Sequence, residues 1–481
     1  MKRLLAVGLD AGDLDFVLMR STSLPNLKSL IQSGTLARVK APRCLSGSVW
    51  PTFAAGREPG VHGIYQHLVW DPQRMGLQRI GAQHSYNNNF WNKLDDKSVR
   101  SIVLDVPYCF PAPLRHGAEI YDWGTHGQTL PIATNSAEVS DWLKKFGKSP
   151  IGREAPIEKS AAELRRIEST LLQSVKAKAD LVEQLMDNFE WDFCLPVFAE
   201  AHRAGHIFHS DDDLQKDPTQ ETPLLRVYQA LDQAIGRILG LVDSSDVVVS
   251  VFSTHGMTRD RNQSGLVQKV MARLNQKFLG ATSVESSGGW VRRLREVIPD
   301  GLQLQAANLA SDSLRQWIVE QEVIGGLDWP NTPAFALRTD IRSEIRLNIK
   351  GRERLGVLEA GSTEMERYRT FLQDAFFSLR DADSEEPLVA DVVALGEIFA
   401  GPNSQLLPDY AIEWRDCPAV ERVSSSVLGE FCITPLSARG GDHRDEGFVL
   451  VNYADDPLTM PSRVSEIGSL FQQLLGVTPD S

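Results

Sequence analysis

Three of the ten histidines in this 481-residue chain fall within eight positions: His202, His206 and His209. They follow the mostly apolar run 193–198, which predicts a strand. If the chain turns helical after Glu200, His202 and His206 share one face, because residues four apart in a helix lie side by side. Two imidazoles on one face can bind one cation. Taken alone, the same residues could equally be solvated or core-satisfied histidines at a polar helix start.

Three further stretches contain residue types that bind metals. Two of these stretches end an apolar run, and the third lies between glycines. Asp10 ends an apolar run of the kind that forms a buried parallel strand, whose carboxyl end would deliver the carboxylate to a site. It could equally cap the next helix. A β-branched run delivers Thr254 and His255 onto a glycine turn. Glycines also precede and follow His443, which allows a tight loop there.

The segment 42–64 is rich in glycine and in small hydroxyl residues. Ser46 in this segment could lie at a helix N-terminus, where backbone amides favour an anion and lower the pKa of a hydroxyl. The same serine could equally belong to a capped loop. Only the motifs elsewhere in the chain can favour one of these two roles for Ser46.

Together these motifs resemble the alkaline phosphatase superfamily, specifically its type I phosphodiesterase/nucleotide pyrophosphatase branch. The run from Trp50 to Ile64 is similar to the bacterial members, in which the nucleophile lies ten residues before a glycine. Counting back ten from Gly56 gives Ser46. His62, in the same run, is expected to form structural hydrogen bonds. The motifs occur in the superfamily order: Asp10, Ser46, His202 with His206, His255, His443.

The resemblance implies two metal sites. The first would be held by three histidines: His202, His206 and His443. The second would be held by a carboxylate, an imidazole and a hydroxyl: Asp10, His255 and Ser46. Relatives usually have aspartate at the positions of His202 and Thr254, so both predicted sites lack a negative charge here. Three imidazoles suit zinc, and the mixed site would admit zinc or manganese, so we expect one or two ions per chain.

The ligands predict the chemistry. Coordinated to zinc, Ser46 would lose its proton at neutral pH and become the nucleophile. The expected activity is metal-dependent hydrolysis of phosphodiester or pyrophosphate bonds, and the expected substrate is a small phosphate ester or nucleotide-like molecule. Three further residues are candidates for contact with substrate or with the ligands: Thr254, Arg444 and His126.

Other activities of the same fold remain alternatives: a phosphomonoesterase, a sulfate-ester hydrolase or a phosphoryl transferase. A sulfatase is disfavoured because Ser46 lacks the proline and arginine of the sulfatase maturation motif. A non-catalytic binding or assembly protein with a degraded metal site is the alternative from another class. Thr254 is the residue that supports it.

The predicted fold is α/β: an alkaline-phosphatase-like core with a mostly parallel central sheet flanked by helices, plus an inserted cap. We expect the core at 1–257 and 401–481. Residues 258 to about 340 do not follow a regular strand–helix alternation, and they contain helical runs at 266–278 and 302–321, so we expect an inserted cap at 258–400. Its position predicts that it sets substrate specificity.

Composition narrows the function class and the compartment. The formal charge of −13 disfavours a nucleic-acid polymer or an anionic membrane as partner. Five cysteines without CxxC spacing predict reduced thiols. Asp10 interrupts the N-terminal apolar run, and no stretch approaches a membrane span. We therefore expect a cytoplasmic protein; no pattern specifies its oligomeric state.

Overall fold

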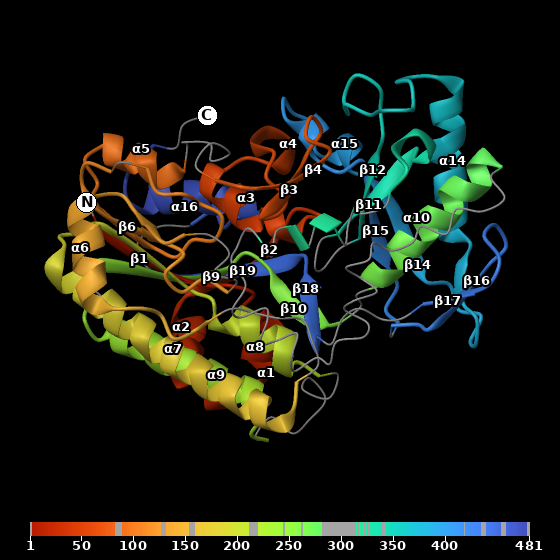
Figure 1. The fold of residues 1–481 in the computed structure, drawn as a ribbon. Coiled ribbons are helices and arrows are strands. Elements are labelled where there is room, and N and C mark those ends of the chain that lie inside the picture. The colour runs from red at the N-terminus through yellow and green to blue at the C-terminus, as the bar shows by residue number, and fades with distance from the viewer. Residues whose placement is uncertain are drawn as a thin grey trace.

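The structure is a computed structural model, in which a large unit and a smaller unit lie side by side (Figure 1). It describes residues 2–81, 89–112, 114–126, 131–152, 159–210, 220–243, 246–260, 263–280, isolated positions from 314 to 324, 327–338, 343–417, 419–433, 439–453 and 458–478. Most of the predicted helix at 302–321 lies outside these residues.

An eight-stranded sheet forms the centre of the large unit, in the order β2-β19-β9-β1-β8-β5-β6-β7. Neighbouring strands from β9 to β6 are parallel, whereas β19 and β7 run antiparallel to their neighbours. The strands are β1 (Arg3–Leu9), β2 (Thr35–Lys40), β5 (Ser101–Leu104), β6 (Gly117–Tyr121), β7 (Ala133–Thr134), β8 (Phe193–Phe198), β9 (Val247–Ser253) and β19 (Glu446–Asn452). The predicted α/β class with a mostly parallel sheet is confirmed.

The apolar runs of the sequence become strands buried on both faces. In β1, Leu5 and Val7 pack into the core on one face of the sheet, whereas Leu4 and Ala6 pack into the core on the other. Successive side chains of a strand point to opposite faces, so a strand covered on both sides must be apolar throughout. This explains why the run before Asp10 shows no alternation.

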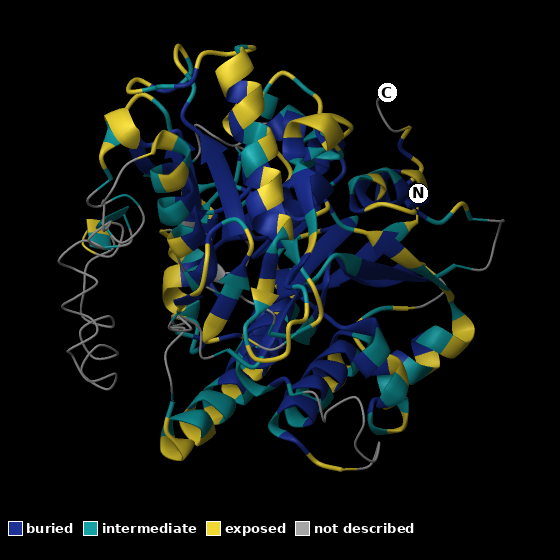
Figure 2. Cartoon of the chain, turned by 90° about the vertical axis from the view of Figure 1, so that its right-hand side faces the viewer, coloured by how far each residue is buried: buried dark blue, intermediate teal, exposed yellow. Residues whose placement is uncertain are grey.

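Helices cover both faces of this sheet. One core contains side chains from α1 (Leu14–Met19), α2 (Pro25–Ser33), α6 (Ala137–Phe146), α7 (Ala161–Asn188), α8 (Glu200–Phe208) and α9 (Pro223–Leu239). The other contains side chains from α3 (Val49–Ala55), α5 (Phe90–Asp96) and α16 (Ile467–Leu474). Figure 2 shows the buried strands between helices whose outer surfaces are exposed. None of the described helices is both long and apolar enough to cross a membrane.

The smaller unit has its own sheet and its own hydrophobic core. Its main elements are α10 (Ser264–Leu279), β11 (Ala334–Arg338), β12 (Ser343–Leu347), α14 (Thr363–Phe377), β14 (Val389–Ala394), α15 (Leu395–Ile398) and β15 (Tyr410–Trp414). A three-stranded sheet adds β13 (Leu379–Asp381), β16 (Arg422–Ser425) and β17 (Phe431–Cys432). Because β15 pairs with β12 and β14, this unit continues past residue 400, where the cap was predicted to end.

Two arginines near residue 350, Arg346 and Arg352, form ion pairs within this smaller unit. Arg346 is buried and pairs with Glu353 at 2.8 Å, and it also donates to the Leu407 carbonyl. Arg352 pairs with Asp409 at 2.7 Å. These contacts tie β12 and the turn that follows it to the segment before β15, so Arg346 and Arg352 are structural residues.

A short helix, α4 (Pro59–His62), and the hairpin β3 (Leu68–Asp71) to β4 (Gly76–Arg79) follow α3. His62 is buried, accepts a hydrogen bond at Nδ1 from the Ile64 backbone and lies 3.0 Å from Thr52 Oγ1 through Nε2. The Nδ1 acceptor role fixes a neutral ring whose Nε2–H donates to Thr52. His62 therefore holds α4 against α3.

We expect His62 to make the folded chain sensitive to acid. Burial lowers the pKa of His62 to about 3, below the ordinary value near 6.5. The unfolded chain therefore takes up this proton at a higher pH than the folded chain. The stability due to the neutral ring is complete above about pH 6.5 and is lost at up to about 1.4 kcal/mol per pH unit as the pH falls toward 3.

Urea unfolding of the native chain and of His62→Gln, measured between neutral pH and pH 4, tests this expectation. The free energy of unfolding should fall less steeply in the variant, because glutamine does not titrate. Equal slopes in the two chains would contradict the assignment.

Candidate active site

The parallel strands end at one edge of the sheet, and a polar residue follows each of them closely. These residues are Asp10 after β1, Asp105 after β5, Asp122 after β6, Glu200 after β8 and Thr254 after β9. All five are buried. Ligands of open α/β sheets bind at this edge, so this is where a site is expected.

Helix α8 carries His202 and His206 on one face and lies against strand β18 (Gly441–Arg444). Two glycines permit this close approach. A Cβ on Gly205 would lie 2.6 Å from Met257 Cε, and a Cβ on Gly441 would lie 2.5 Å from the Gly205 carbonyl oxygen. A side chain at Gly441 would push the helix away from the strand, whereas a side chain at Gly205 would have to displace the Met257 side chain.

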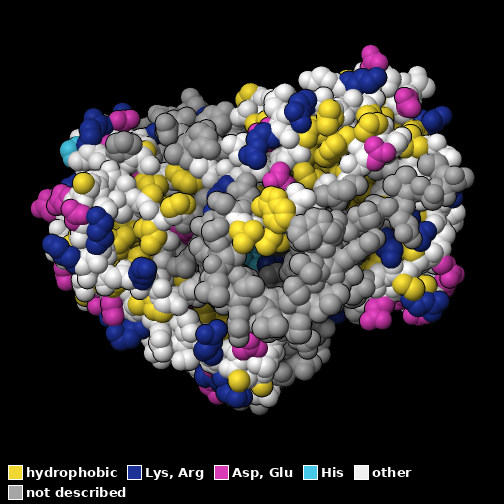
Figure 3. Space-filling view, viewed as in Figure 1, with side chains coloured by type: hydrophobic (Ala, Val, Ile, Leu, Met, Phe, Trp, Pro, Cys, Tyr) yellow, Lys and Arg dark blue, Asp and Glu magenta, His cyan; other side chains and the backbone are white. Residues whose placement is uncertain are grey.

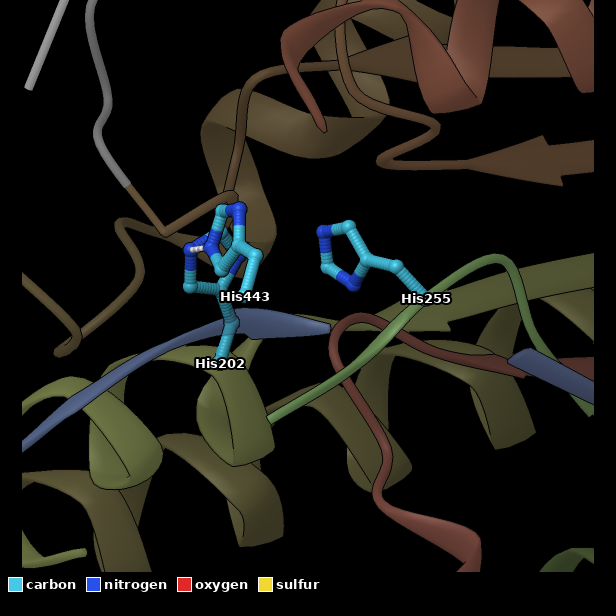
Figure 4. Close-up of side chains that lie close together, drawn as sticks. All are labelled: His202, His255 and His443. Carbon is cyan, nitrogen blue, oxygen red and sulfur yellow. Dashed lines mark hydrogen bonds between the residues drawn. The ribbon is translucent and has the colours of Figure 1, made fainter. Parts of the chain in front are cut away.

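Strand β18 pairs antiparallel with β10 (Gly256–Arg259), and His443 lies opposite Met257. This register brings His443 beside His255, the residue just before β10, with ring centroids 4.4 Å apart. Figure 4 shows the rings of His202, His255 and His443 gathered from three different elements.

Three imidazole nitrogens converge at the end of α8. The Nε2 atom of His443 lies 2.8 Å from that of His202 and 3.1 Å from that of His206. The Nε2 atoms of His202 and His206 are 2.9 Å apart. All three side chains are buried. The structure therefore brings together the three residues that were predicted to bind the first metal ion.

The second ring nitrogen, Nδ1, of both His202 and His206 has its own hydrogen-bond partner. These partners show that the Nε2 lone pairs of both rings face the centre of the histidine cluster. His206 Nδ1 donates to the Gly441 carbonyl and His202 Nδ1 donates to Asp10, both at 2.8 Å. Each ring, when neutral, then presents an unprotonated Nε2. Burial is the main reason that the pKa values of His206 and His443 lie well below the ordinary range, which favours neutral rings.

The Nε2 lone pairs of His202 and His206 repel one another unless a hydrogen atom or a cation lies between them. A proton on His443 Nε2 can fill this position, and so can a metal ion. Neutral buried imidazoles whose outer nitrogens are fixed by a carboxylate and a backbone carbonyl are the usual ligands of a transition metal. The donor set therefore fits zinc, with three protein ligands and an open fourth position.

Asp10 is fully buried and accepts hydrogen bonds through both oxygens. Its Oδ2 accepts from His202 Nδ1 and from His126 Nδ1, each at 2.8 Å, and its Oδ1 accepts from Trp50 Nε1 at 2.7 Å. Burial alone would raise the pKa of Asp10. The positive charge that His202 carries when protonated, together with the hydrogen bonds from both histidines, outweighs burial and holds this pKa well below the usual range.

The residues of the predicted second metal site lie near Asp10 but are less closely gathered. His255 Nε2 is 3.9 Å from Asp10 Oδ1. Burial lowers the pKa of His255 to about 4, so this ring is also neutral. Thr254 is fully buried, and its hydroxyl has no hydrogen-bond partner among the described residues.

Ser46 begins a 3-10 turn, Ser46–Ser48, that continues into α3. It is buried, and Trp50 one turn later anchors the start of α3 to Asp10. Within the part of the chain that the structure describes, no hydrogen bond holds the Ser46 hydroxyl. Its link to the histidines is thus through Trp50 and Asp10.

The sequence matches the family of type I phosphodiesterases and nucleotide pyrophosphatases over residues 4–304, more than half of its length. The chain belongs to this family. Membership supports a hydrolase of phosphoryl esters. The predicted resemblance to the alkaline phosphatase superfamily is confirmed by the same match.

Solved structures share the fold of this family member. Phosphonoacetate hydrolase from Sinorhizobium meliloti 1021, in complex with phosphonoformate, is 13% identical with a TM-score of 0.56; the match covers 99% of this chain and 96% of that one. A mutant of the alkaline phosphatase PafA is 12% identical with a TM-score of 0.53 and the same coverage. Such identities show the fold alone. No curated protein gives a significant match.

In this phosphodiesterase family member, a buried ion pair positions the loop that carries His126. Lys178 of α7 lies 2.8 Å from Asp105, and both side chains are fully buried. Lys178 also donates to the Gly124 carbonyl, and Asp105 accepts from the Gly124 backbone. His126 follows two residues later and stacks on His202, with ring centroids 3.9 Å apart.

The same edge of the sheet holds strained backbone. Ala11, Cys44, Asp105, Tyr108 and Asp122 all have φ between +53° and +64°, which non-glycine residues rarely adopt. Each follows a parallel strand closely or precedes Ser46. Such strain persists where surrounding contacts enforce it and gathers at functional sites.

Sequence reasoning missed Trp50, Asp105 and Lys178. Lys178 did carry a signal, because it lies with Val175, Leu181 and Val182 on the buried stripe of α7. A lysine on an apolar stripe needs a buried partner. Trp50 and Asp105 have no such pattern in the sequence.

Arg444, a candidate for substrate contact, is held by two carboxylates. It pairs with Asp13 at 2.7 Å and with Asp15 at 2.6 Å. Asp13 also caps α1. These bonds join β18 to the start of α1.

We expect Lys178→Met to destabilise the fold by about 3–5 kcal/mol, because it leaves a buried carboxylate without its cation. The free energy of unfolding in urea measures the effect. Lys176→Met is the matched control: Lys176 lies on the same helix and pairs with Asp180, but it is largely exposed. The control should cost less than about 1 kcal/mol. Equal losses in both variants would refute the buried pair's role.

Proposed function

We propose that this chain is a metal-dependent hydrolase of phosphodiester or pyrophosphate bonds and that Ser46 is its nucleophile. One observation carries the proposal: the Nε2 atoms of His202, His206 and His443 converge within 3.1 Å at the edge of the sheet where a ligand is expected. Family membership supplies the class of reaction.

The ligand chemistry favours zinc, and manganese is the alternative. An ion held by the three histidines would supply Lewis-acid stabilisation of the charge that develops on oxygen. The resemblance to the superfamily offers a second ion on Asp10, Ser46 and His255, so the proposal allows one or two ions per chain.

Ser46 would act by attack of Oγ on phosphorus. The Ser46 hydroxyl proton passes to water, the Oγ–P bond forms while the P–O bond to the leaving group breaks, and the leaving oxygen takes up a proton from water, so the step consumes no net proton. A second water then cleaves the seryl ester and restores the hydroxyl. The buried hydroxyl at the first turn before α3 suits this role, because no described side chain or carbonyl engages it.

The proposed substrate is a small phosphate ester or a nucleotide-like molecule. Figure 3 shows basic and acidic side chains interspersed over the described part of one face, and the net charge of −13 disfavours a polyanionic partner. Five cysteines without CxxC spacing support a cytoplasmic location.

Turnover of a panel of substrates tests the proposal. The purified chain, supplied with zinc or manganese, is assayed with an aryl phosphodiester, a dinucleotide pyrophosphate, an aryl phosphomonoester and an aryl sulfate. We expect the highest kcat/KM for the diester or the pyrophosphate. A clear preference for the monoester or the sulfate would establish another activity of this fold. A chain without bound transition metal and without turnover would be a non-catalytic protein, the alternative that Thr254 supports.

A further inference from the structure

We propose that Asp10 is a positioning residue for His202 rather than a metal ligand, and that this chain holds one ion where its superfamily pattern implies two. The inference rests on the metal centre of the proposed function. It concerns the number of ions and the role of one carboxylate, which the family match leaves open.

Most of the hydrogen-bond acceptor positions of the Asp10 carboxylate are already occupied. An ionised carboxylate offers about four of them. Three are taken by N–H donors: His202 and His126 share Oδ2, and Trp50 occupies Oδ1. The two histidine bonds are both 2.8 Å long. A metal ion on Oδ2 would have to displace these donors.

Among the described residues, few ligand atoms remain near Asp10 for a second ion. Near the remaining acceptor position of Asp10 stands His255 Nε2, at 3.9 Å from Oδ1. Thr254 adds only a neutral hydroxyl, which is a weak ligand. Of the six residues proposed as ligands, Asp10 is the one carboxylate, and it would have to offset the charge of two divalent ions. Two like charges at such short range need more anionic ligands than this to be held together.

The hydrogen bond from His202 gives Asp10 a role as a positioning residue. A carboxylate that accepts from the outer nitrogen of a metal-binding histidine fixes the ring's tautomer and orientation and makes it a stronger ligand. The His126 ring stacks on His202 and donates to the same oxygen, so it keeps both Asp10 and His202 in place. His126 is thus a second positioning residue.

Metal content and affinity of the full chain test the inference. The native chain, Asp10→Asn and the control Asp232→Asn are stripped of metal and dialysed against excess zinc, and bound zinc is counted by mass spectrometry. Affinity is measured by competition with a chromophoric chelator. The visible spectrum of the cobalt-loaded chain reports ligand geometry directly. Asp232 is buried between α9 and α2, so its variant controls for the loss of a buried carboxylate.

We expect one ion in the native chain and still one in Asp10→Asn, bound about 10–100-fold more weakly and with an altered cobalt spectrum. Asp232→Asn should match the native chain in both readouts. Two ions in the native chain, with one lost in Asp10→Asn, would overturn the inference, as would unchanged affinity in Asp10→Asn. A chain that binds one ion but cleaves no ester would support it and would refute the proposed hydrolase instead.

Discussion

Ser46→Ala is expected to lower turnover of the best phosphoester by about a thousandfold or more while leaving the metal content unchanged. Loss of a nucleophile removes the covalent route entirely, and only binding and charge stabilisation remain. The three histidines lie on α8 and β18, and the outer nitrogens of His202 and His206 bond to Asp10 and Gly441 rather than to Ser46. The metal should therefore stay bound.

Ser48→Ala is the matched control for this expectation. Ser48 lies two residues further along the same turn, is fully buried and donates to the Leu45 carbonyl at 2.6 Å. Its loss should cost stability of about 1–3 kcal/mol but little turnover. Single-turnover kinetics and bound zinc, measured on both variants, separate the two roles. Undiminished hydrolysis by Ser46→Ala would exclude this serine as nucleophile.

Much of the architecture could be predicted, because the pattern of apolar residues along each element indicates which of its faces are buried. The apolar run before Asp10 became β1, with both faces covered. The four-residue spacing of His202 and His206 became one face of α8. These patterns depend on contacts made along one element, where period and burial are directly linked.

The arrangement around Asp10 could not be predicted in the same way. Asp10 is hydrogen-bonded to Trp50, His126 and His202, which lie 40, 116 and 192 positions further along the chain. The position of His126 depends in turn on the buried pair of Lys178 and Asp105. Hydrogen bonds of this kind arise from the close approach of loops, and no periodicity in the sequence encodes them.

The boundary of the smaller unit also depends on contacts between segments rather than on the pattern within one element. Strand β15 pairs with β12 and β14 of the smaller unit, so residues 410–414 belong there rather than to the core. Strand pairing is a contact between segments, and a single apolar run fits either sheet.

His206→Ala is expected to abolish both metal binding and turnover. The variant loses one of three neutral ligands, and the two remaining imidazoles cannot hold zinc in tetrahedral geometry. Bound metal stabilises the native chain by about 2.7 kcal/mol when its concentration is one hundred times Kd. The rise in Tm on adding zinc should therefore disappear in the variant, and the protein should contain no zinc after dialysis.

His209→Ala provides the control from the same stretch. His209 is the third histidine of the cluster and is also buried, but it caps the end of α8 and stands outside the converging Nε2 atoms. This variant should keep its zinc and most of its turnover. If His209→Ala lost the metal and His206→Ala kept it, the three-histidine site would be wrong, because binding would then follow the density of histidines rather than their convergence.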